Sequence, residues 1–166
     1  ISHDDYRATL TNNETSAQLT MVKAPAEGRE AWKTKLFFET GLTLEAGKTY
    51  RISADVKASD EFTYEICYNN GAVEKDLGAL YDLTAKKVVQ TETFDVTPDA
   101  EKELIIQFSL GNAKKDTVVT VSNVKVEELK EKTGKNIMTD ALSSWAPVHH
   151  WADHGYKTTI TNNSSD

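Results

Sequence analysis

The chain has little cysteine and a deficit of basic residues, and these two features exclude several classes of site and partner. Its 166 residues include one cysteine, Cys67, which can form neither an internal disulfide nor a Cys-x-x-Cys zinc site. We expect Cys67 to be a small buried or strand-face residue. Acidic residues outnumber basic ones by 26 to 19, whereas binding to nucleic acid or an anionic membrane needs a basic face. No apolar run approaches the roughly 20 residues of a membrane span. We therefore expect neither nucleic acid nor membrane as a partner.

Motifs of known catalytic chemistry are missing as well. The sequence contains no nucleophile elbow, no P-loop and no His-Glu-x-x-His motif. With 26 acidic residues, some pair satisfies any carboxylate spacing, so their number is no evidence for a glycoside hydrolase. His149, His150 and His154 lie near Asp153, but adjacent residues on a strand point apart. We expect no catalytic residue and no metal site.

The chain begins at Ile1 rather than at a methionine, and it shows no signal peptide. We therefore expect a processed or excised piece of a larger protein. Its length and its 39% of hydrophobic residues suit one globular domain with a real core.

Short stretches in which apolar and polar residues alternate dominate the sequence. A period of two is that of a half-buried strand, and turn residues such as Gly47, Gly71 and Gly111 separate the stretches. The pattern predicts an all-β fold, a β-sandwich of the jelly-roll kind. The rival is a mixed α+β fold with a helix over residues 124–132, where the Val-x-Val pattern is strand-like. The alternating apolar sets are Ala17, Leu19, Met21; Tyr50, Ile52, Ala54, Val56; Tyr64, Ile66, Tyr68; Ile106, Phe108, Leu110; and Val119, Val121, Val124, Val126.

Eight residues near the start of the chain recur near its end. Residues 6–13 read YRATLTNN and residues 156–163 read YKTTITNN, with five identical positions. Self-similarity at a fixed offset indicates an array of similar units. We therefore predict that residues 1–129 form one module lacking its first strand, that residues 130–135 are a polar linker, and that residues 136–166 begin a second module.

Residues 41–53 carry a motif with a family resemblance. They read GLTLEAGKTYRIS, and this Leu-x-Leu-x-x-Gly-x-x-Tyr pattern resembles the core of carbohydrate-binding modules of families 4, 9, 16 and 22. Residues 93–97, 107–111 and 119–126 resemble further segments of those modules, and residues 136–145 resemble their opening. The resemblance implies a β-jelly roll that is appended to bacterial glycoside hydrolases and binds glycans.

One position departs from the family pattern. The resembling modules usually have Asp-Asn-Val near the last strand, and that Asp often helps to hold a structural calcium. Ser122 stands there in this chain, and a hydroxyl is a poor substitute for a carboxylate oxygen. We therefore expect no cofactor, with a structural calcium as the one open alternative.

A sugar-binding face needs aromatic rings that cover the C–H faces of pyranoses. A Trp near the position of Trp32 often lines the cleft in the resembling modules, and Tyr68 and Tyr81 flank a segment with loop character. In the second unit we expect Trp151 to be exposed and Trp145 to be core. The predicted ring contacts are thus Trp32, Tyr68, Tyr81 and Trp151, with Tyr64 as a further candidate, while Tyr50, Phe94 and Phe108 are expected in the core.

Polar side chains at outward positions of the same sheet should bind the sugar hydroxyls. Gln107 stands between the inward Ile106 and Phe108, and several resembling modules have a Gln in the cleft at this point. Its amide offers two donors and an acceptor. Asp55 and Lys35 are further candidates on neighbouring strands, with a solvated strand face as the alternative for all three.

These observations favour a non-catalytic carbohydrate-binding module that anchors a multi-modular bacterial glycoside hydrolase to a plant β-glycan, either xylan or β-glucan. We expect it outside the cell or on the cell surface, in a tandem array whose copies add avidity. The alternative is a structural or adhesive β-sandwich repeat of a bacterial surface protein, without a glycan cleft. A small glycan-active enzyme is the third hypothesis.

The missing first strand leads to a prediction about residues 136–145. A sandwich without that strand exposes apolar surface and backbone hydrogen-bonding groups. We expect residues 136–145 to fill the vacant place, either in the same chain as a circular permutation or in a neighbour as a domain-swapped dimer. Residues 151–166 would then compete with residues 1–16.

Overall fold

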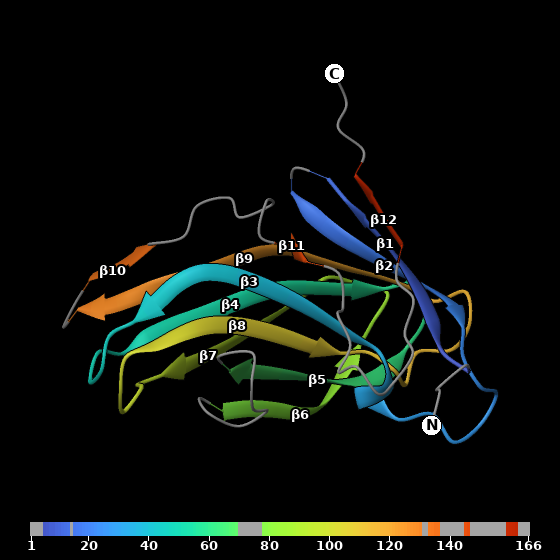
Figure 1. Ribbon diagram of the computed structural model, residues 1–166, viewed down its shortest axis with the longest axis horizontal. Helices are drawn as coiled ribbons and strands as arrows, with labels where there is room; N and C mark the ends of the chain where they lie inside the picture. Colours follow the sequence, from blue (N-terminus) through green and yellow to red (C-terminus); the bar gives the residue numbers. More distant parts are fainter. Residues whose placement is uncertain are drawn as a thin grey trace.

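The chain folds into two facing β-sheets (Figure 1). The computed structural model describes residues 5–13, 15–69, 78–130, 133–136, 145–146 and 159–162. In these residues the only helical element is a short 3-10 turn, η1 (Ala31–Lys33). The all-β sandwich that the alternation predicts is confirmed. The rival helix over residues 124–132 is wrong as far as residue 130, because this part belongs to strand β9 (Val118–Lys130).

Strand order places the last two described strands, β11 and β12, at sheet edges. The described strands of the first sheet follow the order β12-β1-β2-β9-β4-β7, with β10 paired to the end of β9, and those of the second follow β11-β3-β8-β5-β6. Among these strands only β1 and β12 pair in parallel. The bounds in the seven-stranded sheet are β1 (Arg7–Asn12), β2 (Ser16–Lys23), β4 (Tyr50–Ala58), β7 (Gln90–Val96), β9, β10 (Thr133–Asn136) and β12 (Thr159–Asn162); those in the five-stranded sheet are β3 (Lys35–Leu44), β5 (Phe62–Asn69), β6 (Gly78–Ala85), β8 (Lys102–Ser109) and β11 (Trp145–Ala146).

The core between the sheets is built from the alternating apolar residues of the sequence. Both sheets contribute fully buried side chains, and Phe94 and Val124 pack against them while remaining partly exposed. The large apolar area removed from water is the main stabilising contribution to a sandwich of this kind. The largest fully buried side chains are Tyr50, Tyr64, Phe38, Phe108, Leu10, Leu19, Met21, Leu36, Leu44, Ile52, Ile66 and Leu104.

A β-bulge explains a change of parity within β9. Val121 and Val126 are both buried although one is odd-numbered and the other even-numbered. The register between β4 and β9 shifts between Ser53 and Asp55, and Asn123 on β9 has a left-handed φ of 51°. One extra residue on the bulged strand turns the following side chains back to the core.

Strands β10 and β11 attach the C-terminal part to the module. β10 pairs antiparallel with the end of β9, with Thr133 opposite Lys130, in the range 130–135 where a polar linker is expected. β11 adds to the edge strand β3, with Trp145 opposite Phe38. The end of the predicted opening strand is therefore paired within the same chain.

The two copies of the repeat lie side by side in the seven-stranded sheet, as the red β12 beside the blue β1 shows in Figure 1. Thr9 pairs with Thr159 and Asn12 pairs with Asn162, so each residue of β12 faces its own counterpart in β1. The copies pair with each other here rather than competing for one place, because β2 covers only one edge of β1 and leaves the other edge to β12.

Candidate functional site

The outer face of the five-stranded sheet gathers side chains from four strands. They alternate with the core residues, and the register places Phe37, Gln107 and Cys67 in one row across β3, β8 and β5. Lys35, Ser109 and Glu65 form the next row. Tyr81 stands on the neighbouring edge strand β6, where the pairing of β5 with β6 is irregular. This outer face mixes polar and apolar groups.

Gln107 occupies the centre of this outer face but is covered. Its predicted strand parity is right, because Ile106 and Phe108 both point into the core. Its predicted exposure is wrong, because only 3% of Gln107 is accessible. The amide Nε2 donates a hydrogen bond to Ser109 Oγ over 3.0 Å. The amide is therefore committed to a buried neighbour rather than presented to solvent.

We expect the replacement Gln107→Ala to destabilise the fold by about 1–2 kcal/mol, because it removes the donor to the buried hydroxyl of Ser109. Urea unfolding measures this change. The matched control is Gln18→Ala, because Gln18 is an exposed strand glutamine with a long side-chain hydrogen bond to Thr120. This control should lower the free energy of unfolding by less than about 0.5 kcal/mol. Equal losses for the two variants would contradict the buried role of Gln107.

Trp32 and Tyr81 are the predicted ring contacts that the structure leaves accessible. Trp32 in η1 is 39% exposed, and Tyr81 on β6 is 51% exposed. The ammonium of Lys33 lies 3.8 Å from the centre of the Trp32 ring, which is a cation–π contact that favours one orientation of the indole. Contact of these rings with a ligand stays a prediction. Trp151 lies outside the described residues, and of Trp145 only the backbone pairing is described.

Tyr68 and Asp55 occupy places other than those expected of ligand contacts. Tyr68 is 2% exposed and stacks on Phe94 across the core, so its ring belongs to the packing between the sheets. Burial raises the pKa of its hydroxyl well above the usual range. Asp55 lies on β4 in the seven-stranded sheet, not beside Gln107. Its two carboxylate oxygens accept hydrogen bonds from Thr91 and from Asn123 at the bulge, so it holds the bulged strand.

Tyr64, the further aromatic candidate, is also a core residue. Its side chain is fully buried among the core residues, and its hydroxyl donates to Glu92 Oε1 over 3.1 Å. Burial, the nearby carboxylate and this hydrogen bond raise the pKa of the phenol, in that order of importance. The hydrogen bond runs from β5 of one sheet to β7 of the other and so connects the two layers.

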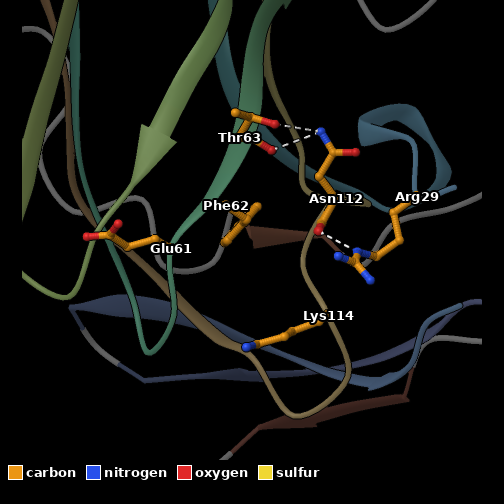
Figure 2. A pocket seen from close by; sticks show the side chains of 6 residues that line it. All are labelled: Arg29, Glu61, Phe62, Thr63, Asn112 and Lys114. Atoms are coloured by element: carbon orange, nitrogen blue, oxygen red, sulfur yellow. Dashed lines mark hydrogen bonds between the residues drawn. The ribbon is translucent and has the colours of Figure 1, made fainter. Parts of the chain in front are cut away.

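A polar pocket opens at one end of the sandwich (Figure 2). Its volume is about 580 Å³, and three separate segments line it: the loop before η1, the start of β5 and the turn after β8. Asn112 donates from its amide to the carbonyl and the hydroxyl of Thr63 over 3.1 and 3.0 Å. The lining residues are Arg29, Glu61, Phe62, Thr63, Asn112 and Lys114.

Close backbone contact holds the loop of Arg29 and Trp32 against the turn after β8. The amide of Gly111 donates to the carbonyl of Ala31, and the amide of Leu110 donates to the carbonyl of Thr34, both over 2.7 Å. Arg29 reinforces this contact by donating from Nε to the carbonyl of Asn112 over 2.9 Å. One wall of the pocket and the exposed Trp32 therefore belong to one segment, residues 29–34, which we call the anchored segment.

No sequence signal pointed to this pocket. Its residues come from three segments that are far apart along the chain, and each alone is an ordinary loop or strand-end residue. The Asn112 side chain could have been noticed, because it follows Gly111 in a predicted turn, but its partner Thr63 belongs to another strand.

The described residues contain no group of three or more His, Cys, Asp or Glu side chains placed to hold a metal ion. Ser122, at the position of the calcium-binding Asp of the resembling modules, pairs within the sheet with Ser16 on β2 and with Asp55 on β4. His149, His150, Asp153 and His154 lie outside the described residues. In the same described part of the chain, no helix has the length and apolar character needed to cross a membrane.

Comparison with known proteins finds likeness in structure only. No family model matches the chain, and no curated protein matches it. A CBM4 structure shares 21% identity at a TM-score of 0.56, over 76% of this chain and 81% of that one. The PbXyn10C CBM shares 15% identity at a TM-score of 0.55, over 89% of this chain and 85% of that one. The N-terminal cellulose-binding domain of Cellulomonas fimi β-1,4-glucanase C shares 18% identity at a TM-score of 0.50, over 78% and 92%.

Likeness at these identities establishes the fold. The chain has the jelly-roll type of β-sandwich that is found in carbohydrate-binding modules.

Proposed function

We propose that this chain is a non-catalytic carbohydrate-binding module. The observation that carries the proposal is the end pocket, where the aromatic Phe62 lies among the hydrogen-bonding groups of Asn112, Arg29 and Glu61. A pyranose has apolar C–H faces and a rim of hydroxyls, so its recognition needs a ring and several polar groups together. The exposed Trp32 follows Arg29 in the same anchored segment and offers a second ring.

The fold likeness supports this function and suggests its setting. One structural neighbour is a binding module of PbXyn10C, and another is a cellulose-binding domain of a β-1,4-glucanase. We propose that this chain holds a multi-modular bacterial glycoside hydrolase on a plant β-glycan, with xylan or β-glucan as ligand, outside the cell or on its surface. Tethering of this kind raises the effective concentration of substrate at a linked active site.

Affinity electrophoresis in gels containing soluble xylan or soluble β-glucan tests the function. One of the two glycans should retard the protein, with a Kd of roughly 10 μM to 1 mM in solution, or about −4 to −7 kcal/mol. Release of reducing sugar from the same glycans should be absent. Unchanged migration on a panel of plant glycans would overturn the proposal, and sugar release would replace it by a catalytic function.

We expect the replacement Trp32→Ala to weaken glycan binding at least about tenfold, because the change removes a ring contact from a shallow site. Isothermal titration calorimetry measures the affinity, and an unchanged unfolding curve shows that the variant is folded. Trp32→Phe keeps a flat ring and should recover part of the loss. A folded Trp32→Ala protein with the affinity of the parent would remove Trp32 from the binding site.

A second function is favoured by one specific observation. The parallel pairing of β1 with its repeated copy β12 shows that repeated segments of this chain can join edge to edge. This is the contact that a structural or adhesive β-sandwich repeat would use. That function predicts no binding to any glycan and full stability of the isolated module, so the same electrophoresis separates the two.

A further inference from the structure

The end pocket has positively and negatively charged side chains on different sides. Figure 2 shows Phe62 in the middle, with the carboxylate of Glu61 on one side and Asn112 and Arg29 on the other. Lys114 lies below Phe62 in this view. The opposite charges line different parts of one cavity, so a ligand with a charged group and a hydroxyl edge would be held in a single orientation.

Arg29 has no carboxylate partner among the described residues. It is half-buried, and its three hydrogen bonds all go to neutral carbonyls: Nε to Asn112 over 2.9 Å, and Nη1 to Pro25 over 3.0 Å and to Ala26 over 2.5 Å. None of these hydrogen bonds uses Nη2. A guanidinium prefers carboxylate or phosphate oxygens. In a chain with a net charge of −7, an arginine held in this way is a site for an anionic ligand group.

Lys114 can add to the same anionic subsite. Its ammonium pairs with Asp60, and the hydrogen bond from Lys114 is the main reason that the pKa of Asp60 is lowered. The lysine side chain is 60% exposed, and an exposed ion pair of this kind contributes little free energy. Exchange of the Asp60 carboxylate for a ligand carboxylate would therefore cost little.

We infer that the pocket binds a sugar unit that carries a carboxylate, that is, a uronosyl residue of a plant glycan. Arg29 and Lys114 bind its carboxylate. The carboxylate of Glu61 and the side-chain amide oxygen of Asn112 accept hydrogen bonds from its hydroxyls, and Phe62 covers an apolar face of the sugar ring. The volume of about 580 Å³ is that of a small-ligand site. This inference rests on the proposed glycan-binding function and adds to it a preference for acid-substituted chains.

Calorimetric titration with two matched ligands tests the inference. One ligand is a xylo-oligosaccharide with a glucuronosyl branch, and the other is the same oligosaccharide without the branch. The branched ligand should bind at least about fivefold more tightly in low salt. The preference should shrink towards 0.5 M NaCl, since salt screens exposed charges.

Neighbouring lysines provide the variant and its control. Lys114→Gln should lose most of the preference for the branched ligand, which is measured as the ratio of its affinity to the affinity of the unbranched one. Lys115→Gln should change neither, because Lys115 lies outside the pocket and pairs with Asp116. Arg29→Lys keeps the charge but loses the planar fork, and it should also reduce the preference.

The outcomes separate the inference from the function on which it rests. Binding of both oligosaccharides with equal affinity would leave the module a glycan binder and overturn the acidic subsite. A preference that survives Lys114→Gln and Arg29→Lys unchanged would also overturn it, because the carboxylate would then bind elsewhere. Failure of the protein to bind either ligand, or soluble β-glucan, would instead contradict the proposed function.

Discussion

Replacement of Gly111 by alanine should destabilise the protein by about 3 kcal/mol. A Cβ at this position would collide with the carbonyl oxygen of Glu30 and lie 2.9 Å from both Ala31 O and Thr34 N. All three obstacles are backbone atoms of the anchored segment, and two hydrogen bonds hold that segment against the turn. The segment must therefore move away as a whole, which also displaces Arg29 and Trp32 from the pocket.

Urea unfolding measures the loss, and a second glycine provides the control. Gly41 has a positive φ of 66°, but a Cβ there meets no heavy atom within 4 Å. Gly41→Ala should cost only the backbone strain of about 1 kcal/mol. The Gly111→Ala protein should also bind glycan more weakly than the Gly41→Ala protein. Similar stability losses at the two glycines would show that the contact at Gly111 is looser than the structure has it.

Removal of residues 136–166 should lower the free energy of unfolding by about 3 kcal/mol, and the melting temperature by roughly 6–12 °C. The shortened chain lacks β11 and β12, so β3 and β1 lose their edge partners. Unpaired edges expose backbone donors and acceptors and the apolar residues beneath them. Calorimetry gives the melting temperature, and light scattering gives the oligomeric state.

A chain that ends at residue 150 divides this effect between the two strands. It keeps the two-residue β11 on β3 and loses the four-residue β12, so it should show more than half of the stability loss. If the chain that ends at residue 135 stays monomeric and melts like the parent, the C-terminal segment is no part of the module's fold.

The sequence predicted side-chain parity better than it predicted burial. The inward positions of Tyr50, Ile66 and Phe108 follow from local alternation alone, and all three are buried. Gln107 is buried although its parity points it outward, and its pairing partners Phe37 and Cys67 come from two other strands. Alternation is a local property, whereas cover on the outer face is decided by which strands become neighbours.

Two predicted site residues, Tyr68 and Asp55, lie in other places than expected, for specific reasons. Tyr68 shares its parity with Tyr64 and Ile66, so its core position followed from the same alternation that the apolar sets obey. Asp55 was expected beside Gln107, but strands next to each other in a sandwich are not fixed by their order in sequence, and β4 joins the other sheet. The pocket could not be predicted, because it forms only where a loop, a strand start and a turn from distant parts of the chain meet.

The pairing of β12 with β1 limits how sheets of this kind can join. Each β1 has two edges, and β2 already occupies one of them. In this chain β12 occupies the other edge, so both edges of β1 are paired within one chain. A strand that is paired on both sides presents no free row of backbone N–H and C=O groups to another chain. The repeated strand therefore removes β1 as a place where a further strand could add to the sheet.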